Sequence, residues 1–342
     1  MINLEFYNIF GSNGIIFASI FILHNQTWRV LKMKISNILV VGEYEEVFQK
    51  HMPPTISQSF RFVSANEISE EDMEWADAYV GSAPASRFDL TKLQWVHSFN
   101  AGVNNYLVVG GWHENNVVLT RTICSFGQRI SEYCLSYILR DIQFQKYFEE
   151  LQEEKKWVRN PPTMLKEQTI VVFGTGEIGQ EVARNFSYFG TTVYGVSQSG
   201  TQKEYFEKVF TTSSASTILS EADWVISTLP LTNETKGLFN TELFSHFNNA
   251  AFINVGRGAT VDEAALITAL ESGKISKAVL DVVSIEPLPV DSPLWVRDDI
   301  TITPHISAIT DLEEAVRCFF DTLKKIQQNE ALPNKVDVSK GY

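Results

Sequence analysis

Three polar residues in the C-terminal half of the sequence each follow an apolar run typical of a buried strand. Arg257 lies in I-N-V-G-R-G, Glu286 follows L-D-V-V-S-I, and His305 lies in I-T-I-T-P-H-I-S. The carboxyl ends of the strands in a parallel sheet share one edge, and ligands bind there. We therefore expect an arginine, a carboxylate and a histidine to converge at one site, where such groups can bind an anion and transfer a proton.

A glycine-rich turn predicts a second site. The residues from Gly174 to Gly179 read G-T-G-E-I-G, after the strand-like I-V-V-F and before the helix-like Q-E-V-A-R-N-F. Gly174 permits a tight turn, Gly176 lets a pyrophosphate approach the backbone, and Gly179 lets the helix pack on the strand. The free N–H groups at the start of that helix would hold the phosphates. The context favours a dinucleotide site over a turn that is glycine-rich without a ligand.

The choice of nucleotide depends on one further position. An acidic residue that binds the ribose 2′-hydroxyl is expected about 20 residues after the glycine-rich turn. That position is occupied by Ser197, within V-S-Q-S-G, and the nearest cation is Lys203. A 2′-phosphate would therefore meet no carboxylate. Both NADP and NAD remain open as cofactors, with a slight preference for NADP.

The elements that position these residues alternate between strands and helices. In the second half of the chain, apolar runs predict strands at residues 170–173, 192–196, 224–227, 251–255, 278–282 and 300–303. Runs of this kind are typical of a parallel sheet with helices on both faces. A smaller α/β unit precedes them, with strands at residues 38–41, 60–63, 78–80, 93–99 and 117–120 and a helix at residues 43–51. Helical periodicity predicts one long helix from Arg129 to Trp157 and a final helix over residues 311–328.

Length and composition restrict the class of protein. A chain of 342 residues favours two domains, and the net charge of −13 argues against nucleic acids and anionic membranes as partners. The three cysteines, Cys124, Cys134 and Cys318, fit neither a disulfide framework nor a metal site, so we expect no metal and a reducing, cytoplasmic location.

The first 32 residues are interpreted separately. The apolar run at residues 15–23 is too short to span a bilayer as a helix, and no positive charge precedes it. We expect residues 1–32 to be an extension outside the domains, and a chain that begins at Met33 to be soluble and active. The alternative is an inefficient membrane leader.

Taken together, the motifs resemble the D-isomer-specific 2-hydroxyacid dehydrogenase family, which includes glyoxylate/hydroxypyruvate reductases and phosphoglycerate dehydrogenases. Further similar segments are N-A-G-V-N-N at residues 100–105, S-T-L-P-L-T at residues 227–232 and the C-terminal N-K-V-D-V-S-K-G-Y. The resemblance extends over residues 33–342. The sequence departs from the family pattern at Ser197 and at Asn104, where many members have aspartate.

The resemblance implies a role for each residue at the sheet edge. Arg257 would hold the substrate carboxylate and polarise the keto oxygen, His305 would donate a proton to that oxygen, and Glu286 would keep the imidazolium charged and oriented. Substrate contacts are implied for Ser82, Ala101, Gly102, Val103 and Arg257. Cofactor contacts are implied for Gly174, Gly176, Glu177, Ile178, Gly179, Ser197, Gln198, Ser199, Leu229, Pro230, Thr235, Val255, Gly256 and Asp281, the last with the nicotinamide carboxamide.

The resemblance also implies the architecture and a competing function. We expect two doubly wound, Rossmann-like α/β domains in a homodimer. An NAD(P)-binding domain, residues 128–309, would be inserted into a flavodoxin-like substrate domain of residues 33–127 and 310–342. The expected activity is hydride transfer between NAD(P)H and a small 2-keto acid. The alternative is a nicotinamide-sensing, co-repressor-like binding protein with the same fold.

Overall fold

The computed structural model describes residues 33–341. The expectation for residues 1–32 therefore lies outside the described residues. Two parallel sheets, one of five strands and one of seven, make up the framework of the described chain.

The first sheet contains β1 (Asn37–Val41), β2 (Ser59–Val63), β3 (Ala78–Gly81), β4 (Trp95–Ser98) and β5 (Val118–Arg121). Its order is β2-β1-β3-β4-β5, and all neighbouring strands are parallel. The strand order reverses between β1 and β3, as in a flavodoxin-like fold. The five strands expected in this region are confirmed.

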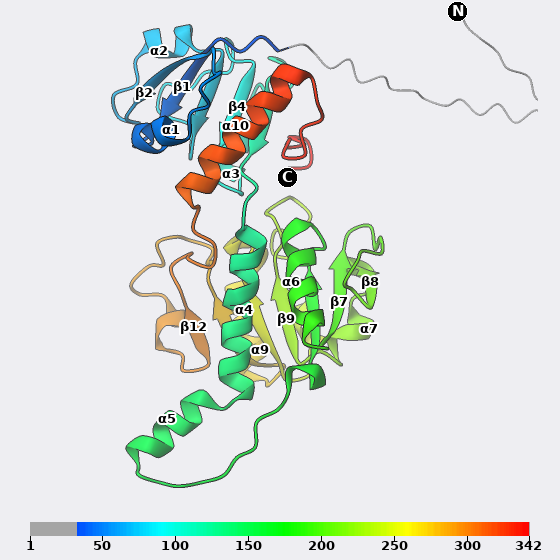
Figure 1. Cartoon of the computed structure of the whole chain (residues 1–342). Coiled ribbons are helices and arrows are strands. Elements are labelled where there is room, and N and C mark those ends of the chain that lie inside the picture. The colour runs from blue at the N-terminus through cyan, green and yellow to red at the C-terminus, as the bar shows by residue number, and fades with distance from the viewer. Residues whose placement is uncertain (1–32, 342) are drawn as a thin grey trace, which may run out of the picture. The chain divides into compact units, whose positions relative to one another are not determined.

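Helices cover both faces of the first sheet. Residues that point to either face are therefore apolar, and the strands contain consecutive apolar residues. Leu39 and Tyr79 pack with α2 (Glu70–Trp75) and α3 (Asn104–Leu107) on one face. On the other face, Val40 and Val80 pack with α1 (Glu45–His51) and α10 (Leu312–Gln328). Figure 1 shows α10 lying across this sheet, although it comes from the far end of the chain.

The second sheet contains β6 (Thr169–Phe173), β7 (Thr192–Ser197), β8 (Lys208–Thr211), β9 (Trp224–Ser227), β10 (Ala250–Asn254), β11 (Ile275–Leu280) and β12 (Ile300–Ile302). The order is β12-β11-β10-β9-β6-β7-β8, again fully parallel. The order reverses between β6 and β9, where a doubly wound sheet binds its ligand. The six expected strands are confirmed, and β8 is an addition.

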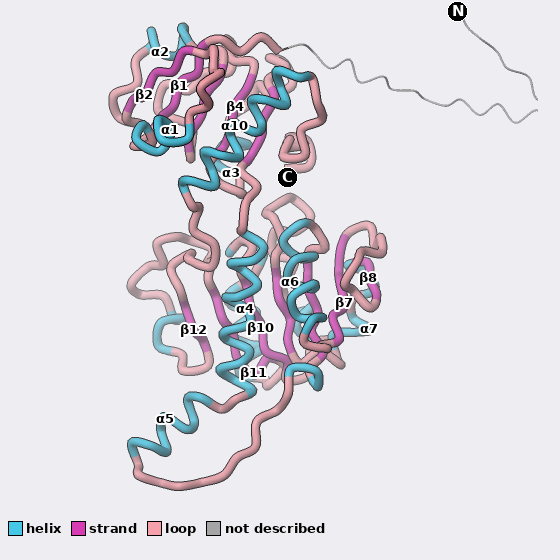
Figure 2. The backbone as a smooth tube through the Cα atoms, viewed as in Figure 1, coloured by secondary structure: helices cyan, strands magenta, loops and turns pink. Residues whose placement is uncertain are grey.

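Helices also enclose the second sheet. On one face, α4 (Phe126–Ile142) packs beside α6 (Glu177–Tyr188), as Figure 2 shows, and both bury side chains against β6, β9 and β10. The opposite face is covered by α7 (Ser216–Leu219), α8 (Thr241–Ser245) and α9 (Glu263–Glu271). Burial on both faces accounts for the nearly continuous apolar runs of these strands.

The chain leaves the first sheet after β5, forms the whole second sheet, and returns with α10. After α10, the backbone of Val336 donates a hydrogen bond to the carbonyl of Leu119, 2.9 Å away, on β5. This arrangement confirms two Rossmann-like units, one inserted into the other. The boundaries at residues 127 and 310 stay predictions.

The prediction of one helix from Arg129 to Trp157 is wrong. Helix α4 ends at Ile142, and a separate helix, α5 (Gln145–Glu153), follows. Phe144 lies between them in the left-handed region, with φ 55°, and its N–H bonds to the carbonyl of Asp141. A residue in the left-handed region ends an α-helix, and the chain continues in a different direction after it. No glycine or proline marks this break in the sequence.

Candidate active site

The glycine-rich turn between β6 and α6 has the shape that a phosphate requires. Gly174 has a positive φ of 99°, and a Cβ at Gly179 would lie 1.8 Å from the carbonyl oxygen of Gly174, so neither position accepts a side chain. By contrast, nothing lies within 4 Å of the Cβ position of Gly176, the residue just before α6. Open space in front of a helix N-terminus fits a pyrophosphate, which the backbone N–H groups can bind.

The turns after β9 and β10 lie against this glycine-rich turn. Thr228 donates from its hydroxyl to the carbonyls of Phe173 and Gly174, at 3.1 and 3.2 Å. A Cβ at Gly256 would lie 2.5 Å from the carbonyl oxygen of Leu229. Thr235 donates to the carbonyl of Pro230 at 2.6 Å and shapes the β9 turn. Of the residues expected to bind the cofactor, the structure brings the glycine-rich turn together with Leu229, Pro230, Thr235 and Gly256 at the reversal point of the sheet.

The end of β7 carries hydroxyl groups in place of a carboxylate. The Ser197 hydroxyl accepts a hydrogen bond from the N–H of Gly200, and the Ser199 hydroxyl accepts one from the N–H of Thr201, each at 3.2 Å. Gly200 has a φ of 63°, which favours glycine. Lys203 is exposed a few residues further on and forms no ion pair within residues 33–341.

Arg257 begins the turn after β10 and reaches the first sheet's loops. Its Nε donates to Oδ1 of Asn104 at 3.2 Å, and its Nη1 donates to the carbonyl of Gly256 at 2.7 Å. The amide of Asn104 also donates to the carbonyl of Leu231 at 3.2 Å. Asn104, noted in the sequence only as a departure from the family pattern, is thus the side chain that orients the guanidinium.

Electrostatics around Arg257 favour an anionic ligand. Burial lowers the pKa of Arg257, the Glu286 carboxylate raises it, and Arg121 lowers it. The guanidinium remains charged because an arginine side chain does not lose its proton in proteins. Arg121, which sequence reasoning missed, also donates to the carbonyl of Ala101 at 3.1 Å. The positively charged guanidinium groups of Arg121 and Arg257 therefore both lie beside the loop that contains Ala101.

His305 and Glu286 form a direct pair. The Nδ1 of His305 lies 2.8 Å from Oε2 of Glu286, while Oε1 of Glu286 accepts from the N–H of Val283 at 3.2 Å. The other ring nitrogen, Nε2, has no hydrogen-bond partner in residues 33–341, and the His305 side chain is 51% exposed. This geometry holds the imidazole by one nitrogen and leaves the other accessible.

Asp281 has a different environment from the one expected of a cofactor ligand. The residue is 1% exposed, and its carboxylate accepts hydrogen bonds from the Thr303 hydroxyl at 2.6 Å, from Ile306 N at 2.8 Å and from Ser307 N at 2.9 Å. The implied contact with the nicotinamide carboxamide stays a prediction. In the structure, the carboxylate binds the turn that carries His305, which has a φ of 55°. That conformation costs a residue other than glycine about 1–3 kcal/mol.

The residues expected to bind substrate from the first sheet lie at the ends of β3 and β4. The Ser82 hydroxyl lies 2.8 Å from the Tyr44 hydroxyl, and the Ser82 carbonyl accepts from Asn100 at 3.0 Å and from Asn105 at 2.7 Å. The nearest atom to a Cβ at Gly102 would be Nη2 of Arg257. Gly102 and Arg257 are thus adjacent, whereas Ser82 forms no hydrogen bond with Arg257 within residues 33–341.

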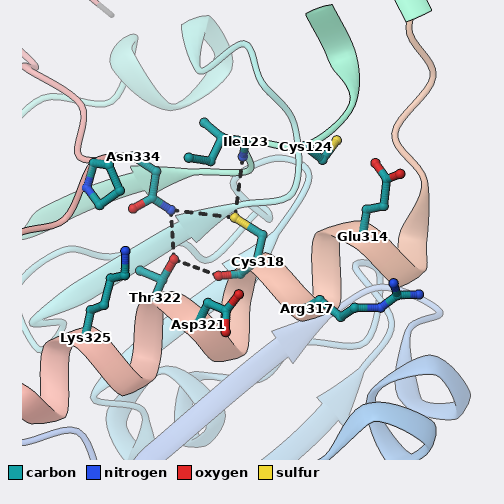
Figure 3. Close-up of a pocket in the computed structure, with 10 residues that line it drawn as sticks. Ile123, Cys124, Glu314, Arg317, Cys318, Asp321, Thr322, Lys325 and Asn334 are labelled. Atoms are coloured by element: carbon teal, nitrogen blue, oxygen red, sulfur yellow. Dashed lines mark hydrogen bonds between the residues drawn. The ribbon is translucent and has the colours of Figure 1, made fainter. Parts of the chain in front are cut away.

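A separate hollow of about 340 Å³ lies beside α10. Figure 3 shows Cys318 within it, where the sulfur accepts from the N–H of Ile123 at 3.4 Å. Burial, together with the nearby Glu314 carboxylate, raises the pKa of the Cys124 thiol to about 12. This hollow contains none of the residues expected to bind cofactor or substrate.

Comparison with known proteins agrees with this geometry. The family profile "D-isomer specific 2-hydroxyacid dehydrogenase, NAD binding domain" matches residues 135–307. An uncharacterised protein of Streptomyces coelicolor is 36% identical over 77% of this chain and 95% of its own length. Glyoxylate/hydroxypyruvate reductase A of Serratia proteamaculans is 34% identical over 63% of this chain and 69% of its own length.

Solved structures show the same similarity. A D-isomer-specific 2-hydroxyacid dehydrogenase from Xanthobacter autotrophicus, in complex with NADPH and MES, aligns with a TM-score of 0.80 at 30% identity, over 90% of this chain and 100% of that one. An NADPH-dependent glyoxylate/hydroxypyruvate reductase from Sinorhizobium meliloti, in complex with NADP and sulfate, aligns with a TM-score of 0.78 at 25% identity, over 90% and 100%.

The doubly wound sheet and the matched nucleotide-binding profile define an oxidoreductase that uses NAD or NADP. The chain belongs to the D-isomer-specific 2-hydroxyacid dehydrogenase family. Residues 33–341 contain no helix with the length and apolar character that a membrane crossing requires.

Proposed function

We propose that this protein reduces a small 2-keto acid to the D-2-hydroxy acid, with Arg257, Glu286 and His305 as the catalytic residues. The observation that carries the proposal is the 2.8 Å contact between His305 Nδ1 and Glu286 Oε2, in a site that also contains the partly buried Arg257, on which the Glu286 carboxylate acts. A carboxylate that holds one imidazole nitrogen stabilises the protonated ring and directs the other nitrogen toward a substrate.

Each residue performs one part of the reaction. Arg257 binds the substrate carboxylate and polarises the keto oxygen, because its charge is fixed and its N–H groups lie in one plane. His305 donates the Nε2 proton to that oxygen, and Glu286 offsets the positive charge of the ring before the transfer. The bound nicotinamide supplies the hydride that C2 of the substrate receives. The backbone of residues 101–103 completes the carboxylate site, next to Arg257.

The substrate class follows from the site and from the relatives. The guanidinium and the backbone N–H groups recognise the carboxylate and keto oxygen that every 2-keto acid has. Relatives with similar sequences are named glyoxylate/hydroxypyruvate reductases. Glyoxylate and hydroxypyruvate are therefore the first compounds to test. NADPH is the preferred cofactor in this proposal, since β7 ends in Ser197 instead of a carboxylate and the solved relatives include complexes with NADPH and NADP.

A panel of substrates tests the proposal. Reduction of glyoxylate, hydroxypyruvate and a branched 2-keto acid is followed with NADPH and with NADH, in the parent protein and in His305→Gln. We expect turnover of at least one small 2-keto acid, and a loss of about 10²–10⁴-fold in kcat for His305→Gln with the affinity for NADPH retained. Tight cofactor binding without turnover of any compound would favour the co-repressor-like binding protein instead.

Two further properties belong to this proposal. A homodimer is supported by apolar side chains exposed on and after α5, namely Tyr147, Trp157 and Val158. Sedimentation velocity measures this directly, and a monomer at micromolar concentration would contradict it. A cytoplasmic location is supported by the three cysteines, all of which are free. Cell fractionation tests the location.

A further inference from the structure

We propose that Tyr133 and Thr303 are positioning residues for His305, and that they act through the buried carboxylate of Asp281. The proposal rests on the assignment of His305 as the proton donor. It adds three hydrogen-bonded side chains: Tyr133 on α4, Thr303 just after β12 and Asp281 just after β11. Together they fix the backbone turn that contains His305.

The chain of hydrogen bonds has a defined direction. The Thr303 hydroxyl donates its proton to Oδ1 of Asp281 at 2.6 Å. The Tyr133 hydroxyl lies 2.6 Å from the same Thr303 oxygen. Because Thr303 has a single hydroxyl proton, Tyr133 must be the donor to Thr303. Burial raises the pKa of the Tyr133 phenol, so the phenol keeps the proton that it donates.

The carboxylate at the end of this chain holds the turn after His305. Its two oxygens accept from the N–H groups of Ile306 and Ser307, and the N–H of His305 itself donates to the backbone carbonyl of Asp281 at 2.9 Å. Three successive N–H groups are therefore bound to one residue. They keep His305 at a φ of 55°, which a side chain other than glycine adopts only when its surroundings impose it.

The orientation of the imidazole depends on this turn and on Glu286 together. Glu286, which lies in the loop after β11, binds Nδ1 of the ring. Asp281 fixes the backbone of the turn from which the His305 side chain extends. Without the hydroxyl of Thr303, Asp281 loses one of its three donors to the carboxylate and the turn gains other conformations. The proton donor then spends less time within reach of the keto oxygen, and a displacement of about 1 Å can reduce turnover 10²-fold.

The experiment removes one hydroxyl at a time. Tyr133→Phe and Thr303→Val delete the two donors, and Thr303→Ser restores the second hydroxyl. Tyr194→Phe and Thr301→Val are the controls: each removes a hydroxyl of the same kind, from β7 and from β12, and neither hydroxyl has a hydrogen bond to the His305 turn within residues 33–341. Two quantities are measured. One is kcat and KM for the 2-keto acid together with the Kd for NADPH. The other is amide hydrogen exchange of residues 305–308 in the protein without substrate.

We expect kcat to fall about tenfold in Tyr133→Phe and further in Thr303→Val, with KM and the Kd for NADPH within about twofold of the parent. Amide exchange of Ile306 and Ser307 should become faster in the same order, and Thr303→Ser should return both quantities toward the parent. The controls should change neither. Parent-like kcat and exchange in Thr303→Val would overturn the proposal. So would a loss confined to NADPH affinity, which would assign Asp281 to cofactor binding. The exchange measurement needs no turnover, so its outcome is independent of whether 2-keto acids are the substrates.

Discussion

The Arg257 guanidinium occupies the space that a side chain at residue 102 would need. A Cβ at residue 102 would lie 1.5 Å from Nη2 of Arg257, and the guanidinium is fixed from its other side by Asn104. The backbone conformation of Gly102 is accessible to other residues, so the constraint at this position comes from the Arg257 guanidinium, which any side chain at residue 102 would have to displace. The loop after β4 and the arginine after β10 thus meet at the place that the proposed function assigns to the substrate carboxylate.

Replacing this glycine should damage substrate binding in particular. We expect Gly102→Ala to displace Arg257 and to lower kcat/KM for the 2-keto acid by about 10–100-fold, with the Kd for NADPH unchanged. Gly110→Ala is the matched control, since no atom lies within 4 Å of its Cβ position. Steady-state kinetics and cofactor titration measure the two effects. Equal kinetics in both variants would mean that Arg257 does not bind the substrate.

The pairing of Glu286 with His305 predicts a loss of turnover when the carboxylate is removed. In Glu286→Gln, the carboxylate 2.8 Å from Nδ1 becomes a neutral amide, so the imidazole loses the charged partner that holds it. We expect kcat for ketone reduction at neutral pH to fall about 10–100-fold, with the Kd for NADPH within about twofold of the parent. Steady-state kinetics and cofactor titration give both quantities, with Glu263→Gln, a carboxylate that binds Ser284 N, as the control. Turnover equal to that of the parent would separate the two residues functionally.

Cofactor preference can be changed at the end of β7. In Ser197→Asp, the new carboxylate would hold a ribose 2′-hydroxyl and repel a 2′-phosphate, so the preference should shift toward NADH by about 10–100-fold, equivalent to ~1.5–3 kcal/mol. Thr192→Asp adds the same charge at the opposite end of the same strand, where the side chain is exposed, and should leave the preference unchanged. The measured quantity is the ratio of kcat/KM for NADPH and NADH. A parent that strongly prefers NADH would refute the assignment of Ser197.

A buried histidine in the first sheet predicts sensitivity to acid. His97 is fully buried, and its Nδ1 lies 2.8 Å from the Thr120 hydroxyl. Burial lowers the pKa of His97 to about 3. An unfolded histidine has a pKa of about 6.5, so between these values the unfolded chain binds a proton that the native protein does not. This residue's contribution to stability is complete above pH 6.5 and is lost as the pH falls toward 3.

The parent should therefore lose about 1.4 kcal/mol more unfolding free energy per pH unit than His97→Asn between about pH 5.5 and 4. Denaturant titrations across this range give both slopes, which remain comparable even if the variant is less stable at neutral pH. His246→Asn, at an exposed position, should keep the parent's slope. Identical slopes in parent and His97→Asn would show that the native protein protonates this ring.

The strands and turns around the candidate active site could be predicted because short, continuous sequence patterns identify them. Gly174 and Gly179 lie a few residues apart, on either side of one turn, and a short sequence pattern records them. The contact between Asn104 and Arg257 joins segments more than a hundred residues apart, as does the bond between Tyr133 and Thr303. No period or composition in a single sequence indicates which distant side chains meet.

The same limit explains the two errors in the elements. The break at Phe144 carries no glycine or proline, so the apolar period continues across it. Strand β8 lies at the edge of its sheet and has four residues, K-V-F-T, too few to give a clear apolar run although three of them favour strands. Tertiary contacts decide both cases, and local propensity does not.

The return of the chain with α10 has a consequence for the order of synthesis. The ring of Trp95 on β4 stacks on Phe319 of α10, with centroids 5.2 Å apart and planes 8° apart. A ribosome makes the whole second sheet before it makes this partner. The first five strands therefore emerge with one apolar face covered only in part, by α1, until α10 is made, whereas the second sheet has all its own residues earlier. In the nascent protein, the first sheet therefore exposes apolar surface that favours aggregation until α10 has been made.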